Sequence, residues 1–411
     1  MTSQNTSSHT LSSHNGWKTF FLLLPAVACL LSVPKSVSAE ETRRIGPWNL
    51  AKLEEVPSAE WGEPVEGIRE VRYSGERFEG KPTSVFAYYG RPEGTGPFPG
   101  VVLVHGGGGK AFRDWVAHWV KRGYAAIAMD LAGNGPDGRL PDGGPDQSHE
   151  AKFRNFTNVT ADTVWSYYAV AAVVQAHSLL ASQPEVDRNK IGITGISWGG
   201  YLTCIVAGLD HRLKVAVPVY GCGFIHEDSA WVEDQFDKMS PEQRELWVKN
   251  FDPSQYLPEV KCPILFLTGT NDVPYPLGIH VKSSLLVDPS RVTLSVIPRL
   301  PHGHIWTFGE VDAFIDSVLK GGKQFVRLDT CLSGDEVFSP YTGPSEGMKF
   351  ELHYSVDQGK WPARVWKAVP AHREGETIRG RLPEKGYAAY FLSATDERGL
   401  SVSSRCQERE E

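Results

Sequence analysis

The stretch GITGISWGGY, residues Gly192 to Tyr201, decides how this chain of 411 residues is interpreted. Ser197 stands between two glycines, shortly after the apolar run KIGITG and directly before WGGYLTCIVAGL, which has the pattern of a helix. A sharp turn between a strand and a helix exposes a serine and orients it as a nucleophile. Glycines near it, which have no Cβ, leave room for the neighbouring backbone. The alternative is an ordinary small residue in a turn, and the surrounding sequence favours the nucleophile.

Apolar runs and helical patterns alternate through the middle of the chain. SVFAYYG alternates apolar and polar residues, and the continuous apolar runs after it are PGVVLVHG, YAAIAMDLAG, KIGITGIS, VAVPVYG, CPILFLTG and VTLSVIP. Continuous runs are typical of strands buried on both faces, as in a parallel sheet. Helix start or stop signals accompany the segments FRDWVAHWVKRG, TADTVWSYYAVAAVVQAHSLLASQP and EVDAFIDSVLKGG. The alternation predicts a doubly wound, mostly parallel α/β sheet.

Two stretches interrupt this alternation. LAGNGPDGRLPDGGPDQSHE is rich in Gly, Pro and Asp and follows the carboxyl end of a strand. It is predicted to be a loop at the edge where open α/β sheets bind ligands. The insertion from Gly223 to about Glu259 contains the helical pattern SAWVEDQFDKMSPEQRELWVKNF. Because this insertion connects two predicted strands, we expect it to lie over the strand ends as a cap.

The pattern changes after Gly322. The runs FELHYSVDQGKWPARVWKAVP and TIRGRLPEKGYAAYFLSATDERGLSVSSR alternate apolar and polar residues, with turn signals between them and no helical pattern. Residues 322–411 are therefore predicted to form a small antiparallel β-sandwich of the immunoglobulin or fibronectin kind. Cys331 and Cys406, near its two ends, either pair or stay unpaired. This sandwich either binds polysaccharide or supports the fold.

The N-terminus has the pattern of an export signal. A lysine precedes the apolar core TFFLLLPAVACLLSV, and small residues fit cleavage after Ala39. This pattern predicts a signal peptide at residues 1–39, a linker at 40–64, and a periplasmic or secreted mature protein without stable membrane insertion. The apolar core is short for a membrane span, and Pro25 interrupts it. A retained anchor and a lipid-modified Cys29 are the alternatives.

The composition argues against one class of function. The formal net charge is −7, and no long basic run is present. A nucleic-acid-binding surface is therefore not expected. Apolar residues make up 41 % and charged residues 22 % of the chain, which is ordinary for a folded globular protein.

A nucleophilic serine needs a base, and the base needs an acid that orients it. Asp272 follows the predicted strand CPILFLTG, and His302 and His304 follow VTLSVIP, so all three leave the sheet at the same edge as Ser197. Serine, then acid, then histidine is the chain order expected for a serine at this kind of turn. Asn271 cannot replace Asp272, because an amide does not stabilise an imidazolium as a carboxylate does. The alternative role for Asp272 is that of a turn-capping residue.

The negative charge that develops during acyl transfer needs N–H donors. One expected donor is the N–H of Trp198, directly after the nucleophile. The other is expected in VVLVHGGGGK, where Gly107 is the first choice and Gly106 the second. A phosphate-binding loop is the rival interpretation. It is disfavoured because Lys110 is followed by Ala111 rather than by Ser or Thr.

Taken together, the stretches LVHGGGG, RGYAAIAMDLAG, GITGISWGG, LTGTNDVPYPL and PHGH resemble the α/β-hydrolase superfamily. More narrowly, the chain is similar to the branch that holds dienelactone hydrolases, acetyl xylan esterases and the catalytic domains of prolyl oligopeptidases. The resemblance implies an α/β-hydrolase catalytic domain at residues 65–321. A cysteine at the sharp turn would point to a dienelactone hydrolase proper, whereas the serine points to ester hydrolysis.

Carried over to the matching positions, the resemblance implies Ser197 as the nucleophile, Asp272 as the acid and His302 as the base. In these relatives the base often lies four residues after a proline that ends the last strand, and Pro298 has this spacing to His302. His304 is a departure that leaves the choice of base open. We expect it to line the site or to cap the following helix. The resemblance implies no metal and no organic cofactor.

The leading hypothesis is an exported serine esterase of the acetyl xylan esterase type, which deacetylates a carbohydrate or a similar small ester. The expected partner is therefore a small-molecule or polysaccharide ester. Four tryptophans either offer flat surfaces to a sugar or belong to the core. They are Trp198, Trp115, Trp119 and Trp306. Because the candidate triad precedes Gly322, we expect removal of the C-terminal domain to leave the hydrolase chemistry intact, with lower stability or lower affinity for a polymeric substrate as the alternatives for what is lost.

Two other hypotheses remain. One is a serine peptidase of the prolyl oligopeptidase kind, although too few residues separate the cleavage site from the hydrolase start for the large β-propeller that such relatives usually carry. The other is a catalytically inactive binding module, against which the intact set of Ser, Asp and His argues.

Overall fold

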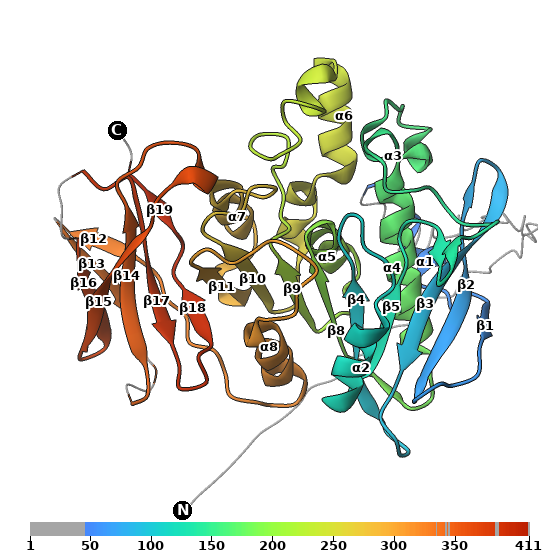
Figure 1. Cartoon of the computed structure of the whole chain (residues 1–411), viewed down its shortest axis with the longest axis horizontal. Coiled ribbons are helices and arrows are strands. Elements are labelled where there is room, and N and C mark those ends of the chain that lie inside the picture. The colour runs from blue at the N-terminus through green and yellow to red at the C-terminus, as the bar shows by residue number, and fades with distance from the viewer. Residues whose placement is uncertain (1–45, 334, 342, 344–345, 383–385, 410–411) are drawn as a thin grey trace, which may run out of the picture. The chain divides into compact units, whose positions relative to one another are not determined.

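Figure 1 shows the computed structural model of the chain, which describes residues 46–333, 335–341, 343, 346–382 and 386–409. The predicted signal peptide at residues 1–39 lies outside the described residues. Among the helices of the described part, none is both long and apolar enough to cross a membrane.

A mixed sheet forms the centre of the structure. Its strands are β1 (Ala59–Trp61), β2 (Ile68–Phe78), β3 (Lys81–Gly90), β4 (Phe98–Val104), β5 (Ala125–Met129), β8 (Val186–Ile196), β9 (Val215–Val219), β10 (Ile264–Gly269) and β11 (Val292–Ile297). Hydrogen bonds place them in the order β1-β2-β3-β5-β4-β8-β9-β10-β11. The strands from β5 to β11 in this order are parallel, and the others pair antiparallel. The predicted doubly wound, mostly parallel sheet is confirmed, and each continuous apolar run is one of its strands.

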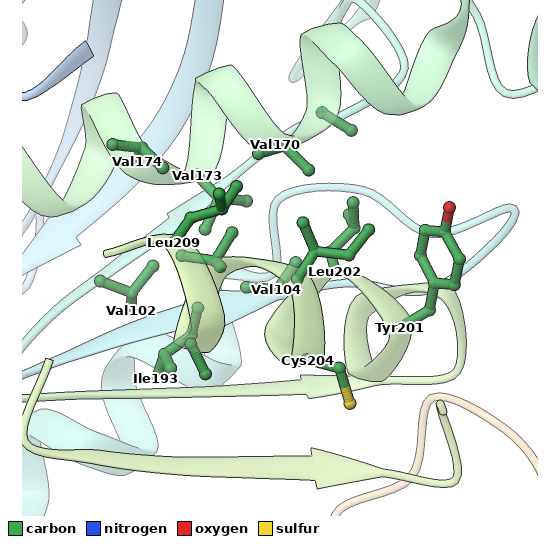
Figure 2. Packing of buried hydrophobic residues seen from close by; sticks show 14 of the residues in the cluster. Val102, Val104, Val170, Val173, Val174, Ile193, Tyr201, Leu202, Cys204 and Leu209 are labelled. Carbon is green, nitrogen blue, oxygen red and sulfur yellow. The ribbon is translucent and has the colours of Figure 1, made fainter. Parts of the chain in front are cut away.

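Helices cover both faces of the sheet (Figure 1). They are α1 (Leu50–Leu53), α2 (Arg113–Lys121), α3 (His149–Phe153), α4 (Trp165–Ala181), α5 (Trp198–Leu209), α6 (Pro241–Phe251), α7 (Leu277–Ser284) and α8 (Gly309–Leu319). Successive residues of a strand point to opposite faces. In β4, Val102 and Val104 therefore pack with α4 and α5, as Figure 2 shows, whereas Val101 and Leu103 belong to the core that contains α2 and α8. Two cores thus hold the central strands from both sides.

The insertion between β9 and β10 is less helical than its pattern suggests. Its main helix, α6, begins only at Pro241, with the Ser240 side chain as its N-cap, and the segment Phe236–Lys238 is a short 3-10 turn. The Tyr201 hydroxyl, in the first turn of α5, donates a hydrogen bond to the Phe251 carbonyl. This bond holds the end of α6 close to the amino end of α5, where the cap was expected.

The Gly-rich loop after β5 contains more regular structure than its composition indicates. It forms the small hairpin of β6 (Asn134–Gly135) and β7 (Gly138–Arg139), followed by α3. The Asp130 carboxylate starts the loop by accepting hydrogen bonds from the N–H groups of Ala132 and Asn134 at 2.8 and 2.7 Å. Local side-chain bonds of this kind let Asp stabilise a turn.

The C-terminal region is all β, as predicted. Its strands are β12 (Cys331–Ser333), β13 (Glu336–Pro340), β14 (Lys349–Ser355), β15 (Lys367–Glu374), β16 (Thr377–Arg381), β17 (Ala389–Thr395), β18 (Ser401–Ser403) and β19 (Gln407–Glu408). They pair antiparallel around a core of their own, which contains Val337, Leu352, Ile378 and Leu392. The domain boundary at residue 322 stays a prediction.

The C-terminal strands also join the central sheet. β18 pairs antiparallel with β11, at Leu294 and Ser403. The hydroxyl of Ser403 accepts a hydrogen bond from the Val296 N–H at 3.0 Å, and the Ser295 hydroxyl donates to the Ser401 carbonyl at 2.7 Å. The C-terminal region therefore covers the β11 edge of the central sheet, a contact that was not predicted from the sequence.

The described cysteines are all unpaired. They are Cys204, Cys222, Cys262, Cys331 and Cys406. Of the two that could have closed the C-terminal region, Cys331 is exposed and Cys406 is buried, and no disulfide joins them.

Candidate active site

Ser197 occupies a strained turn between β8 and α5. Its φ of 60° and ψ of −119° are rare for a residue with a side chain. The Ser197 N–H donates to the Val219 carbonyl at 2.9 Å, which fixes the turn against β9. A Cβ on Gly199 would lie 2.1 Å from the Val104 oxygen, and one on Gly195 would lie 2.4 Å from the Gly199 oxygen. The two glycines are therefore needed for the close approach of the backbone at this turn.

The structure brings Ser197, His302 and Asp272 together at one edge of the sheet. Nε2 of His302 lies 2.9 Å from Oγ of Ser197, and its Nδ1 lies 2.7 Å from Oδ2 of Asp272. The Asp272 side chain is fully buried, and its Oδ1 accepts a hydrogen bond from the Tyr275 N–H at 2.7 Å. A neutral His302 with its proton on Nδ1 donates to Asp272 and accepts the Ser197 hydroxyl proton at Nε2.

Two tyrosines hold the imidazole of His302 in place. The Tyr220 ring lies 4.4 Å from the imidazole, between ring centroids, and the Tyr220 hydroxyl donates to the Gly303 carbonyl. The Tyr275 ring lies 6.3 Å from the imidazole, between ring centroids, and is nearly parallel to it. Neither tyrosine was predicted from the sequence. The only signal for them was their position directly after β9 and within the loop that carries Asp272.

The glycine loop after β4 is fixed by histidines. The Gly106 N–H donates to Nε2 of His304 at 3.0 Å, and Nδ1 of His105 donates to the Gly106 carbonyl at 2.7 Å. Nε2 of His105 accepts from the Leu131 N–H at 2.9 Å. Burial lowers the pKa of His105 to about 4, so its ring is neutral and can fill both roles.

These bonds distinguish Gly106 from Gly107 as the candidate N–H donor of the glycine loop. The N–H of Gly106 is committed to His304, and the N–H of Gly108 donates to Oε1 of Gln147 at 3.0 Å. In the described part of the chain, the N–H groups of Gly107 and Trp198 have no acceptor. Of the two expected glycines, Gly107 is the one whose N–H remains available to a ligand oxygen.

His304 does not cap the following helix. The N-cap position of α8 is Phe308, and the imidazole of His304 packs against Phe112 and Trp115. Burial lowers the pKa of His304, which favours the neutral ring that accepts a hydrogen bond from Gly106. Of the two expected roles, the structure therefore excludes the helix cap and places His304 behind the glycine loop.

Lys152 is a buried cation that the sequence analysis did not single out. Its side chain belongs to α3, and the residue is 3 % exposed. Nζ donates to the Gln147 carbonyl at 2.8 Å and lies 4.7 and 5.0 Å from the ring centroids of Trp198 and Trp165. Burial lowers the pKa of this lysine to about 8. No sequence pattern predicts its burial, because the short segment around it is polar.

The tryptophans considered as sugar surfaces belong mostly to the core. Trp198, Trp115 and Trp119 are buried, and Trp306 is half-buried against Trp115. Among the described residues, no group of three or more His, Cys, Asp and Glu side chains is placed to hold a metal ion.

Comparison with known proteins agrees with this fold. Residues 85–285 match the model of the dienelactone hydrolase family. The chain is 26 % identical, over 324 residues, to the acylamino-acid-releasing enzyme of Homo sapiens, covering 72 % of this chain and 41 % of the relative. It is 22 % identical, over 254 residues, to the acetyl esterase Axe7A of Xylanibacter ruminicola, covering 56 % of this chain and 54 % of the relative. The chain thus spans between two fifths and about half of the length of these curated relatives.

Solved structures share the fold at low identity. The acetyl xylan esterase 1 of Thermoanaerobacterium sp. JW/SL YS485 superposes with a TM-score of 0.51 at 20 % identity, covering 64 % of this chain and 89 % of that one. The acetyl xylan esterase of Paenibacillus sp. R4 gives 0.50 at 22 % identity, covering 66 % and 92 %. Together with the family match over residues 85–285, these likenesses show that the chain has the α/β-hydrolase fold and contains a domain of the dienelactone hydrolase kind.

Proposed function

We propose that this hydrolase is a serine carboxylic-ester hydrolase that removes acetyl or similar small acyl groups from a carbohydrate or another alcohol. The observation that carries the proposal is the position of the His302 imidazole, which is in hydrogen-bond contact with both the Ser197 hydroxyl and the Asp272 carboxylate. This arrangement fits general-base activation of a serine nucleophile.

In the proposed reaction, Oγ of Ser197 attacks the ester carbonyl while Nε2 of His302 takes the hydroxyl proton. The N–H groups of Trp198 and Gly107 donate to the oxyanion of the tetrahedral intermediate, which then collapses as the protonated His302 gives its proton to the leaving alcohol. Water next attacks the acyl-enzyme, with His302 again as the base. The products are the acid and the free serine. Asp272 holds the imidazole tautomer and stabilises the imidazolium in both halves.

The first test is Ser197→Ala on an activated acetyl ester. We expect kcat to fall about 10⁴-fold or more, because the members of a triad act as a unit. Mass spectrometry of the unaltered enzyme, quenched early in turnover, should find one acyl group on the peptide that contains Ser197. A folded Ser197→Ala protein that hydrolyses the ester at the original rate would show that the chain is a hydrolase with another nucleophile, whereas an unaltered protein that hydrolyses no ester would point to an inactive binding module.

A serine peptidase is the second candidate function, and the similarity to the acylamino-acid-releasing enzyme favours it. The two candidates differ in the leaving group, which is an alcohol for an esterase and an amine for a peptidase. A panel of acetyl esters, longer acyl esters, methyl uronates, acyl-peptides and dipeptide amides separates them. We expect kcat/KM for acetyl esters to exceed that for the amides.

We also propose that the mature protein is exported to the periplasm or the medium. The proposal is supported by the lysine, apolar core and small-residue cleavage site within residues 18–39. N-terminal sequencing of the mature protein should begin at Glu40. A cytoplasmic protein that begins at Met1 would contradict export.

A further inference from the structure

The loop that carries Asp272 is attached to the C-terminal region. Nδ2 of Asn271, the residue directly before Asp272, donates hydrogen bonds to the Pro362 carbonyl at 2.9 Å and to the Arg364 carbonyl at 2.8 Å. These acceptors lie 91 and 93 positions further along the chain. Both hydrogens of one amide are thus used to join the loop after β10 to a segment beyond the hydrolase domain.

The other end of the Asn271 side chain connects to the loop that carries the base. The Thr270 hydroxyl donates to Oδ1 of Asn271 at 2.7 Å and accepts a hydrogen bond from the Arg299 N–H at 3.0 Å. Thr270 is fully buried, and Arg299 has the left-handed φ of 54° three residues before His302. The same network therefore ties together the acid loop, the base loop and the C-terminal segment.

The C-terminal segment, residues 357–366, is itself held firmly. Nε of Arg364 donates to the Gly359 carbonyl at 2.9 Å, and the Arg364 guanidinium lies 3.8 Å from the ring centroid of Trp361. Trp361 packs onto α7, the helix that follows the acid loop, so closely that a Cβ on Gly278 would lie 2.4 Å from its Nε1. The carbonyls that Asn271 contacts thus belong to a buttressed segment rather than to a free surface loop.

We propose that Asn271 is a positioning residue through which the C-terminal segment 357–366 fixes the carboxylate of Asp272 toward His302. Its amide is suited to this role because it donates to two carbonyls and accepts from a hydroxyl at the same time, which neither a carboxylate nor an ammonium can do. The inference rests on the proposed function, since it assigns Asp272 as the acid of the triad. It gives the C-terminal region a part in catalysis that does not require that region to touch the substrate.

The test compares Asn271→Ala with Asn250→Ala. Asn250 is a matched control, because it is also half-buried and its Nδ2 donates to a carbonyl, that of Leu246, at 2.8 Å within α6. We expect Asn271→Ala to lower kcat on an activated acetyl ester about 10- to 100-fold, because a displacement of a catalytic group by about 1 Å has an effect of this size. KM should stay within about threefold, since the residue does not contact substrate. Asn250→Ala should leave both values unchanged.

A spectroscopic measurement distinguishes positioning from general loss of stability. The proton shared by His302 and Asp272 should give a far-downfield proton resonance in the unaltered enzyme and in Asn250→Ala. In Asn271→Ala we expect this resonance to broaden or to move upfield. An Asn271→Ala protein with the original kcat and the original resonance would overturn the proposal, whereas an active Ser197→Ala protein would overturn the proposed function instead.

Arg364→Met tests the same link from the C-terminal side and covers the case in which Asn271→Ala does not fold. It removes the bond to Gly359 and leaves the acid loop untouched, so we expect a smaller loss of kcat in the same direction. Because both variants act on one link, their double variant should lose no more than Asn271→Ala alone. A normal kcat and resonance in Arg364→Met, or losses that multiply in the double variant, would contradict the proposal.

Discussion

The Gly106 N–H donates a hydrogen bond to Nε2 of His304 at 3.0 Å, across 198 positions of sequence. This bond assigns different positions to two histidines that are only two residues apart. His302 faces the serine hydroxyl, whereas His304 turns behind the glycine loop. Gly303 between them makes the divergence possible, because a turn points its neighbouring side chains in different directions.

We therefore expect His302→Ala and His304→Ala to differ strongly. His302→Ala should lower kcat/KM on an activated acetyl ester about 10⁴-fold or more, since it removes the proposed base. His304→Ala should cost about 10- to 100-fold, since it lets the glycine loop shift and misplaces the Gly107 N–H. Near-full activity of His302→Ala beside an inactive His304→Ala would reverse the assignment of the base.

The glycines at the turn of Ser197 predict a stability effect that can be measured without a substrate. A Cβ on Gly199 would meet the backbone oxygen of Val104, which cannot move aside as a flexible side chain can. We expect Gly199→Ala to lower the free energy of unfolding by about 3 kcal/mol or more. The measurement is urea unfolding, read from the midpoint and slope of the transition.

Gly144→Ala is the matched control for this prediction. No heavy atom lies within 4 Å of a Cβ built on Gly144, and its φ is not in the left-handed region. The free energy of unfolding of the Gly144→Ala protein should therefore change little, or rise slightly because alanine restricts the unfolded chain. Equal stability of the two alanine variants would mean that the backbone at Ser197 relaxes freely.

The strands and the candidate triad follow from sequence because they rest on local patterns. The apolar runs that became β4, β5, β8, β9, β10 and β11 are buried on both faces, and Ser197, Asp272 and His302 follow the carboxyl ends of three of these strands. Carboxyl ends of parallel strands meet at one edge, so residues that follow them converge whatever their spacing in the chain. Local pattern and topology together were enough for this part of the site.

The supporting contacts could not be predicted, because each joins segments far apart in sequence. Asn271 was considered only as a substitute for the acid, and nothing near it indicates that carbonyls beyond residue 360 would accept its amide hydrogens. The role of His304 depends on the path of the glycine loop, and the burial of Lys152 depends on two distant tryptophans. Side-chain pairing across such distances is set by tertiary packing rather than by local preference.

The contact between β11 and β18 gives a physical reason why removal of the C-terminal region should lower stability. From the sequence, the hydrolase chemistry is expected to survive truncation near Gly322. In the structure, truncation would leave the Val296 N–H without the Ser403 hydroxyl and would expose β11 as a sheet edge. Exposed edges favour aggregation. We expect a chain of residues 40–322 to unfold at a lower temperature than residues 40–411 and to give less soluble protein.

The comparison is made by thermal unfolding and by analytical size exclusion of the two chains. Equal unfolding temperatures and equal ester hydrolysis would show that β18 contributes neither stability nor order to the site. A soluble, folded short chain with reduced kcat would instead agree with the part proposed for Asn271.

Lys152 gives a prediction about pH and stability. Burial lowers its pKa from 10.5 to about 8, so between these values the folded state binds fewer protons than the unfolded state. The contribution of Lys152 to the free energy of unfolding therefore rises with pH through that window. Below about pH 8 the folded state carries the full cost of a buried ammonium. A shift of this size corresponds to about 3 kcal/mol at most, part of which the contacts with the Trp165 and Trp198 rings offset.

We expect Lys152→Met to be more stable than the unaltered protein at pH 7, and this advantage to shrink by pH 9.5. Urea unfolding at the two pH values measures it, and the difference between the two proteins cancels the titration of other groups. Lys249→Met, which replaces an exposed lysine of α6, is the control and should change stability little at either pH. A Lys152→Met protein that is less stable at pH 7 would mean that the ring contacts and the bond to Gln147 outweigh the cost of burying the charge.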